Sequence, residues 1–213
     1  MTVKFFVLGL PGAGKSTVAR FIAISAMGNG WLTTRFNDYT TLQKMFRDDT
    51  EGKQFKPAEH GGFDVLNLTV FDTALQRLEQ EITKYISSAK SDEIIVIEFS
   101  RNDYRKAFLQ FSHEFLHDAY FLYLDVDLET CKKRIHERIA NPGTDDDFFV
   151  SEYIFRTYYN KDNGRHLPRL LERNYTIDKQ RVMIIDNNGP LESSTTRINW
   201  FITTICTLES VRR

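Results

Sequence analysis

The chain has 213 residues, 41% of them hydrophobic, with 28 basic and 29 acidic side chains and a formal net charge of −1. This composition excludes a disordered chain, allows one domain with a sizeable core, and gives no overall attraction to nucleic acid or to anionic membranes. Cys131 and Cys206 are far apart in the sequence and indicate neither a disulfide framework nor a zinc site. No apolar run is long enough to span a bilayer, so we expect a cytoplasmic protein without a membrane partner.

The chain begins with an apolar stretch, residues 3–8, that is typical of a buried strand. A glycine-rich loop follows, and residues 16–27 then show helical periodicity. The loop reads GLPGAGKST over residues 9–17 and matches G-x-x-x-x-G-K-[ST] in full. Strand, glycine loop and helix, in that order, are the context in which this motif predicts a P-loop that binds a nucleoside triphosphate.

Each residue type in this loop has a chemical reason. The glycines allow a close approach of the backbone, so that successive N–H groups surround an anion, and the following helix adds the positive end of its dipole. We expect Lys15 to reach the β- and γ-phosphates and the Ser16 hydroxyl to hold Mg²⁺. The alternative is a plain glycine turn, which the full match disfavours. The predicted nucleotide-binding residues of the loop are Gly9, Pro11, Gly12, Ala13, Gly14, Lys15, Ser16 and Thr17.

Strands and helices alternate through the rest of the chain. We expect strands at 31–36, 94–99, 120–124 and 181–185, helices at 40–47, 71–89, 103–116, 128–140, 145–159 and 198–208, and a polar loop over 48–63. This alternation predicts an α/β fold in which helices cover both faces of a parallel sheet. Ligands bind such sheets at the carboxyl ends of the strands. The acidic residues at these strand ends are Asp38, Glu98, Asp125 and Asp186.

Three segments together resemble the P-loop nucleoside and nucleotide kinases, which include deoxynucleoside, thymidylate and adenylate kinase-like enzymes. They are GLPGAGKST, YLDVDLETCKKRIHERI at 123–139 and RVMIIDNN at 181–188. The second segment is similar to the fourth strand and lid helix of those kinases, where a cysteine precedes two arginines, matched here by Cys131, Arg134 and Arg138. The third is similar to their last strand, and the loop after it, which would include Asn187, lies by the adenine.

The resemblance implies a three-layer α/β/α fold with a five-stranded parallel sheet in the order 2-3-1-4-5. It also implies a single domain over residues 1–213 with a lid at about 134–165, and phosphoryl transfer from ATP. The sequence departs from the family where Glu98 is followed by Phe99-Ser100-Arg101 instead of directly by arginine. The predicted lid also carries Asp145–Asp147, for which a solvent-exposed helix cap is favoured over a metal role.

Two carboxylates are candidates for the base that accepts the proton of the acceptor hydroxyl. Glu98 interrupts an apolar strand, where an ionised side chain is costly unless it faces a polar cleft, and the alternative is a buried structural ion pair. Asp38 ends the second strand, where uridine-kinase-like enzymes place an aspartate, and the alternative is a helix N-cap. We expect Glu98 to be the base and a second contact of Mg²⁺, and Asp38 to contact the acceptor.

Four arginines are candidates for phosphate contacts. Arg134 and Arg138 share one helix face and, as lid arginines, would neutralise charge on the transferring phosphoryl group. The alternative is a solvated face that pairs with Glu137 or Asp145. Arg101 and Arg105 follow the third strand and could hold a phosphate of the acceptor, or could belong to the surface.

The sequence therefore predicts an ATP- and Mg²⁺-dependent kinase with a small acceptor, for which a nucleoside or nucleotide is favoured. A nucleotide-dependent switch or ATPase without an acceptor stays open as an alternative. A nucleic-acid 5′ end is a further, less favoured acceptor candidate, because a solvated helix face is the favoured interpretation of the basic run that suggests it. The residues of this run are Arg165, His166, Arg169, Arg173 and Lys179.

A remote alternative is a zinc hydrolase, because the chain contains the zincin signature H-E-x-x-H. Glu137 could in principle supply a third ligand. The surrounding βαβ series disfavours this interpretation. The five residues of the motif are His113, Glu114, Phe115, Leu116 and His117.

Overall fold

The computed structural model describes residues 1–88, 92–140, 150–160, 163–189 and 192–211. Five parallel strands form a central sheet in the order β2-β5-β1-β6-β7, and a separate pair, β3 and β4, lies outside it. Counted along the chain within the sheet alone, this order is 2-3-1-4-5, so the predicted topology is confirmed. The bounds of the sheet strands are β1 Thr2–Leu8, β2 Leu32–Asn37, β5 Glu93–Phe99, β6 Tyr120–Asp125 and β7 Val182–Asp186.

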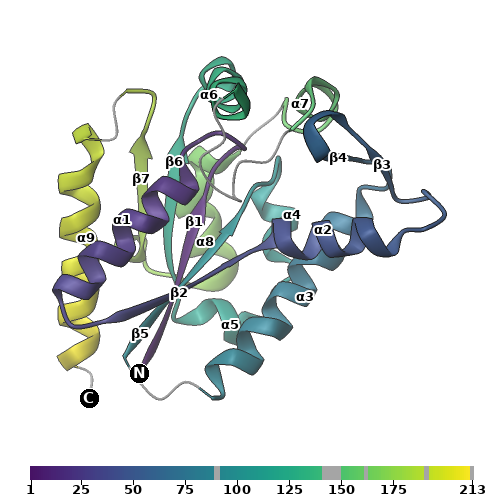
Figure 1. Ribbon diagram of the computed structural model, residues 1–213. Helices are drawn as coiled ribbons and strands as arrows, with labels where there is room; N and C mark the ends of the chain where they lie inside the picture. Colours follow the sequence, from purple (N-terminus) through teal and green to yellow (C-terminus); the bar gives the residue numbers. More distant parts are fainter. Residues whose placement is uncertain (89–91, 141–149, 161–162, 190–191, 212–213) are drawn as a thin grey trace.

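The helices lie on both faces of this sheet (Figure 1), which confirms the predicted three layers. One core cluster joins the sheet to α1 and α9, and a second joins its other face to α3, α4, α5 and α8. Alternate residues of β1 divide between them, with Phe5 and Val7 in the first cluster and Phe6 and Leu8 in the second. The helix bounds are α1 Lys15–Gly28, α2 Asp38–Asp48, α3 Thr69–Ile86, α4 Tyr104–Phe108, α5 His113–His117, α6 Leu128–Ala140, α7 Glu152–Thr157, α8 Leu167–Tyr175 and α9 Glu192–Val211.

Strand β5 is buried along its whole length because it lies inside the sheet and is covered on both faces. Its apolar residues therefore run continuously, and Glu98 near its end is a buried carboxylate at 3% exposure. Strand β2 is an outer strand of the sheet, and its residues are only half-buried or exposed. Charged side chains on β2 can therefore reach both the solvent and the carboxyl end of β5.

The predicted loop over 48–63 is wrong, because this region contains the antiparallel strands β3 Phe55–Pro57 and β4 Phe63–Val65 with a 3₁₀ turn, Glu59–Gly61, between them. Strands of three residues are too short to show an alternating pattern. Two contacts hold the hairpin in place. Its aromatic rings pack on Phe46 of α2, and the carboxylate of Asp49 accepts hydrogen bonds from the N–H groups of residues 53, 54 and 55 at 3.2, 2.8 and 2.9 Å.

Two predicted helices are also corrected. The segment 103–116 forms two short helices, because Asp103 caps α4 and Ser112, in an extended conformation, caps α5. Within the segment 145–159, α7 begins only after Ser151, whose hydroxyl accepts from the N–H of Ile154 at 3.2 Å. Asp145–Asp147 lie outside the described residues. Two further 3₁₀ turns, Gly164–His166 and Lys179–Arg181, flank α8.

Cys131 and Cys206 are both buried, and neither forms a disulfide. In the described part of the chain, no helix combines the length and the apolar character that crossing a membrane would require.

Candidate active site

The glycine loop joins β1 to α1 at the carboxyl end of the sheet (Figure 1). Gly12 and Gly14 adopt φ angles of 82° and 96°, which favour glycine. A Cβ on Gly12 would lie 2.4 Å from the carbonyl oxygen of Cys131, so the loop packs directly on α6. The hydroxyl of Tyr104 accepts a hydrogen bond from the Gly9 N–H at 2.9 Å. Tyr104, the first residue of α4, is not part of any sequence motif, and it supports the loop through this hydrogen bond.

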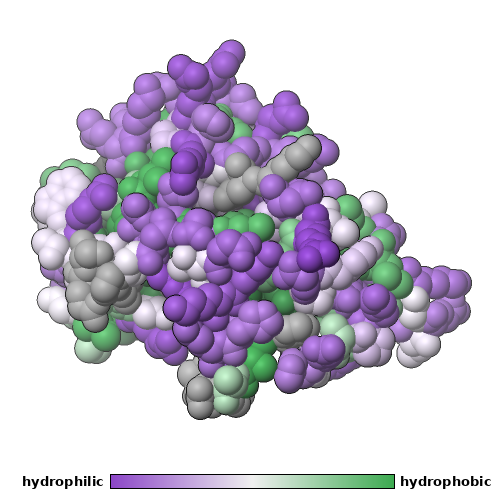
Figure 2. All heavy atoms as spheres, turned by 90° about the horizontal axis from the view of Figure 1, so that it is seen from above, coloured by the Kyte–Doolittle hydropathy of each residue, from purple (hydrophilic) through white to green (hydrophobic). Residues whose placement is uncertain are grey.

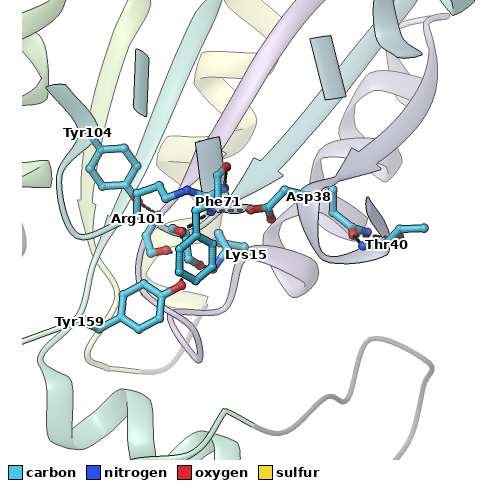
Figure 3. A network of polar contacts seen from close by, with 10 residues as sticks. Lys15, Asp38, Thr40, Phe71, Arg101, Tyr104 and Tyr159 are labelled. Atoms are coloured by element: carbon cyan, nitrogen blue, oxygen red, sulfur yellow. Dashed lines mark hydrogen bonds and ion pairs between the residues drawn. The ribbon is translucent and has the colours of Figure 1, made fainter. Parts of the chain in front are cut away.

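Lys15 is half-buried at the start of α1, beside the loop (Figure 3). Its ammonium donates to the carbonyl oxygens of Gly9 and Leu10 at 3.1 and 2.9 Å and to Ser100 Oγ at 2.6 Å. Burial lowers the pKa of Lys15 to about 8, although the nearby Glu98 carboxylate favours the charged form. The amine is therefore held where the motif predicts that phosphates bind, with three oxygen acceptors that phosphate oxygens would replace.

Glu98 lies in an ion pair with Arg35 of β2. Arg35 Nε donates to one carboxylate oxygen of Glu98, and Arg35 Nη2 lies 3.3 Å from the other. The same Nη2 donates to Ser16 Oγ at 3.0 Å. An ion pair is the alternative that the sequence analysis gives for Glu98, and this ion pair is present. The role of Glu98 as a base stays a prediction. The sequence analysis does not select Arg35. The signal that could have identified it is a basic residue in an otherwise uncharged strand.

Asp38 and Arg101 form a second pair, both buried, at 6% and 3% exposure. Arg101 Nη1 donates to the Asp38 carboxylate, Nη2 donates to the carbonyl oxygen of Phe71 at 2.8 Å, and the guanidinium lies over the Phe71 ring (Figure 3). Burial opposes the charge on Arg101, but Asp38 outweighs it and the pKa of Arg101 is raised. The N-cap alternative for Asp38 is wrong, because Asn37 caps α2 through the Thr40 N–H.

The predicted lid arginines lie at the same edge of the sheet. Arg134 Nη2 donates to the carbonyl oxygen of Asn187 at 2.8 Å. The buried Asn187 amide in turn donates to the carbonyl oxygen of Ala13 at 2.9 Å, so the segment after β7 braces the P-loop. Arg134 and Arg138 both line a cavity that opens over the P-loop. Arg105 is exposed on α4 and does not line this cavity, so the structure does not bring it to the site.

A cavity of about 300 Å³ opens over the P-loop. Among the described residues, five basic side chains and two carboxylates line it, which gives it the positive character that a polyphosphate requires. Figure 2 shows this end of the molecule from above, where hydrophilic side chains cover most of the surface. The charged lining residues are Lys15, Arg20, Arg35, Asp38, Glu98, Arg134 and Arg138.

A second, mainly apolar cavity of about 70 Å³ adjoins the first. The two share four lining residues, Pro11, Asp38, Tyr39 and Ser100. The β3–β4 hairpin and α7 supply apolar walls to the second cavity. Its other lining residues are Leu42, Phe63, Val65, Phe71, Arg101, Val150, Ile154 and Tyr159. A polar compartment over the P-loop thus continues into an apolar one walled partly by aromatic rings.

Hydroxyl and carboxylate oxygens are the ligands that Mg²⁺ prefers, so Ser16 and Glu98 are suitable in kind. Both accept hydrogen bonds from Arg35, however. These residues therefore fit a magnesium ion only when the guanidinium of Arg35 has withdrawn.

The zincin signature lies on α5, at the end of the sheet opposite the P-loop (Figure 1). The His113 ring packs against Tyr175 with centroids 4.8 Å apart, and His117 Nδ1 lies 3.0 Å from the Asp118 carboxylate. Within the described residues, no group of three or more His, Cys, Asp or Glu side chains could hold a metal ion. The motif is thus separate from the cavity over the P-loop.

The basic run after α7 lies on α8 and on the two 3₁₀ turns that flank it. All five of its side chains are exposed, Arg165 forms an ion pair with Asp125 at 2.7 Å, and Lys179 forms one with Glu172 at 3.0 Å. The solvated-face interpretation therefore accounts for these residues.

The fold is shared with solved P-loop structures. A gluconokinase from Sinorhizobium meliloti 1021 is 14% identical, with a TM-score of 0.51, over 99% of this chain and 97% of that chain. A shikimate kinase from Acinetobacter baumannii, in complex with shikimate, is 16% identical, with a TM-score of 0.51, over 96% and 94%. Kti12 from Chaetomium thermophilum, in complex with ADP-AlF3, is 14% identical, with a TM-score of 0.54, over 93% and 96%.

At these identities the likeness establishes the fold alone. No curated protein matches the sequence significantly. The family model described as "AAA domain" (AAA_33) matches residues 5–159, which is more than half of the chain and includes the P-loop, both ion pairs of the site and the predicted lid arginines. The chain therefore belongs to this AAA domain family of P-loop proteins.

Proposed function

We propose that the protein is an ATP-dependent kinase that transfers the γ-phosphoryl group to a hydroxyl of a small acceptor, with a nucleoside or nucleotide as the acceptor class. The observation that carries this proposal is the junction of two cavities of different character at the P-loop. The polar cavity suits a triphosphate, and the apolar cavity suits a separate organic molecule whose hydroxyl lies at the shared wall.

The residues of the polar cavity have distinct roles in this proposal. The P-loop N–H groups and Lys15 bind the phosphates, and Arg134 and Arg138 neutralise charge that builds up during transfer. Glu98 orients the acceptor hydroxyl and takes its proton. Mg²⁺, when bound, would be held by Ser16 and Glu98, and it would neutralise charge on the phosphate oxygens.

The aromatic walls of the second cavity favour a planar acceptor. Tyr39 lines both cavities and stacks on Phe63 with ring centroids 5.6 Å apart, so Tyr39 is the ring that we propose contacts the acceptor. The Phe71 ring already stacks on Tyr158 at 4.5 Å and lies under Arg101. Flat rings of this kind bind nucleobases by stacking, at roughly 1–3 kcal/mol per base. Asp38, at the wall shared by both cavities, would accept a hydrogen bond from the sugar or the base.

The test is a screen of nucleosides, nucleoside monophosphates, sugar acids and small alcohols for ADP production from ATP. We expect ADP production to rise well above the acceptor-free rate with at least one nucleoside or nucleotide. If only sugar acids or small alcohols stimulate ADP production, the proposal of a kinase stands, but the proposed acceptor class is wrong. The transferred phosphate should be identified on the acceptor by mass spectrometry.

A nucleotide-dependent switch or ATPase is the second candidate, and one observation favours it. Both candidate carboxylates already have arginine partners, Glu98 with Arg35 and Asp38 with Arg101, so the site satisfies its buried charges without an acceptor. ATP hydrolysis that no acceptor in the screen stimulates would favour this second candidate over the kinase.

A further inference from the structure

Arg35 reaches the site from the outer strand of the sheet. In the register between β2 and β5, Arg35 lies opposite Val96 and Asn37 lies opposite Glu98. Because residues two apart on a strand share a face, Arg35 and Glu98 are diagonal neighbours on one face of the sheet. A side chain as long as arginine spans this distance, so the strand pairing itself brings the guanidinium to the carboxylate.

A single guanidinium here contacts both residues that the sequence predicts for magnesium. It donates to both carboxylate oxygens of Glu98 and, through Nη2, to Ser16 Oγ at 3.0 Å. The Glu98 side chain is 3% exposed, whereas that of Arg35 is 29% exposed. The arginine is therefore the partner with room to withdraw, because its outer side still faces solvent.

A guanidinium and a divalent cation exclude each other at this position. Both are positively charged, and both need the oxygen lone pairs of Ser16 and Glu98. An N–H group that points at an oxygen occupies the lone pair that a metal would use. Among the described residues no strand covers β2 on its outer side, so Arg35 has solvent into which it can swing.

We propose that Arg35 occupies the cation position of the nucleotide site and competes with the divalent cation for Ser16 and Glu98. This inference rests on the proposed function, because it requires a nucleotide with its metal in the polar cavity. The apparent affinity for the cation is then reduced by the fraction of molecules in which Arg35 has withdrawn. If about one molecule in ten is in that state, the apparent Kd for the metal is about tenfold higher than without the arginine.

The experiment measures Mn²⁺ binding by the loss of the free-ion signal in electron paramagnetic resonance, in the presence of saturating ADP. The variants are Arg35→Met, which removes the charge and the donors, and Arg35→Gln, which keeps an N–H donor toward the buried Glu98. The matched control is Arg20→Met, since Arg20 lines the same cavity but donates to Thr17 Oγ1, at 3.5 Å, and not to Ser16 or Glu98.

We expect the Kd for Mn²⁺ to fall about tenfold in Arg35→Met, to fall in the same direction in Arg35→Gln, and to stay unchanged in Arg20→Met. Removing the arginine leaves Glu98 buried without this cation, so Arg35→Met could unfold, and Arg35→Gln then carries the test. Unchanged Mn²⁺ affinity in the folded Arg35 variants, or equal tightening in Arg20→Met, would overturn the inference.

A parallel titration with ADP in EDTA distinguishes a failure of this inference from a failure of the proposed function. ADP binding without metal, combined with unchanged Mn²⁺ affinity, would overturn only the competition by Arg35. A wild-type protein that binds no ADP with or without Mn²⁺ would overturn the proposed function, and this inference with it.

Discussion

Lys15 Nζ and Ser100 Oγ are joined by a hydrogen bond of 2.6 Å, which connects the first residue of α1 to the residue directly after β5. Ser100 lines both the polar and the apolar cavity. The predicted phosphate ligand and the shared wall of the two cavities are therefore one hydrogen bond apart. When Lys15 turns to a phosphate, the hydroxyl of Ser100 loses a donor at the place where the acceptor hydroxyl is expected.

The first prediction concerns Lys15→Ala. It removes a fixed positive charge where negative charge gathers, and loss of one such group costs on the order of 3 kcal/mol of transition-state stabilisation, or about a hundredfold in rate or more. Steady-state ADP production measures the loss, and circular dichroism confirms that the variant is folded. Wild-type turnover in this variant would refute the role of the P-loop in transfer.

The second prediction concerns the lid arginines. Arg134→Ala and Arg138→Ala should lower turnover by about a hundredfold while weakening ATP binding much less, because their charge is needed mainly in the transition state. Arg134 also donates to the carbonyl oxygen of Asn187, so its variant should additionally loosen the segment after β7 and speed exchange of the Asn187 N–H, which donates to Asp125. Measured kcat and the Kd of a non-hydrolysable ATP analogue separate the two effects. If both variants keep full turnover, the lid assignment is wrong.

The third prediction assigns the base. Glu98→Gln should leave ATP binding nearly intact and reduce acceptor phosphorylation roughly 10²–10⁴-fold, whereas Asp38→Asn should mainly raise the KM for the acceptor. Asp38→Asn also leaves Arg101 buried without its carboxylate, which should destabilise the fold by about 3–5 kcal/mol in chemical denaturation. The reverse kinetic pattern would exchange the two roles.

The fourth prediction tests the apolar cavity as the acceptor site. Val65 is 5% exposed and lines this cavity, so the phenyl ring of Val65→Phe should fill the space and raise the KM for the acceptor at least tenfold. The Kd for ATP should change little, because Val65 does not line the polar cavity. Leu66→Phe is the matched control, since Leu66 is the next residue and is 48% exposed. An acceptor KM that changes equally in both variants would place the acceptor elsewhere.

The fifth prediction concerns the pH dependence of the hairpin. Desolvation opposes the charge on Asp49, but the N–H groups of residues 53, 54 and 55 outweigh it, and the pKa of this carboxyl is lowered from 3.8. A lowered folded pKa stabilises the hairpin above the unfolded pKa, and this stabilisation is lost as the pH falls through the folded value. Amide exchange at Gln54 and Phe55, normalised for its intrinsic pH dependence, should accelerate below about pH 4. In Asp49→Ala it should already be fast at neutral pH.

The sequence by itself determined the P-loop and the strands that surround it. The loop is a contiguous motif whose glycines have backbone angles that other residues rarely adopt, so nine neighbouring letters suffice to specify it. The buried strands are also identified by a local signal, because a strand covered on both faces must be apolar along its length. The strand order followed from the resemblance to known kinases, and the sheet confirms it.

Only the tertiary structure decided how the charged residues of the site pair. Arg35 with Glu98 and Asp38 with Arg101 are each separated by 63 residues, and they meet because β2 and β5 are neighbours in the sheet. No local pattern says which carboxylate either arginine pairs with. The same pairing places Asp38, whose carboxylate turns inward to the buried guanidinium of Arg101. The preceding Asn37 caps α2 by accepting from the Thr40 N–H. A buried charge needs a partner wherever the fold supplies one, and that partner is set by distance in space, which a single sequence does not contain.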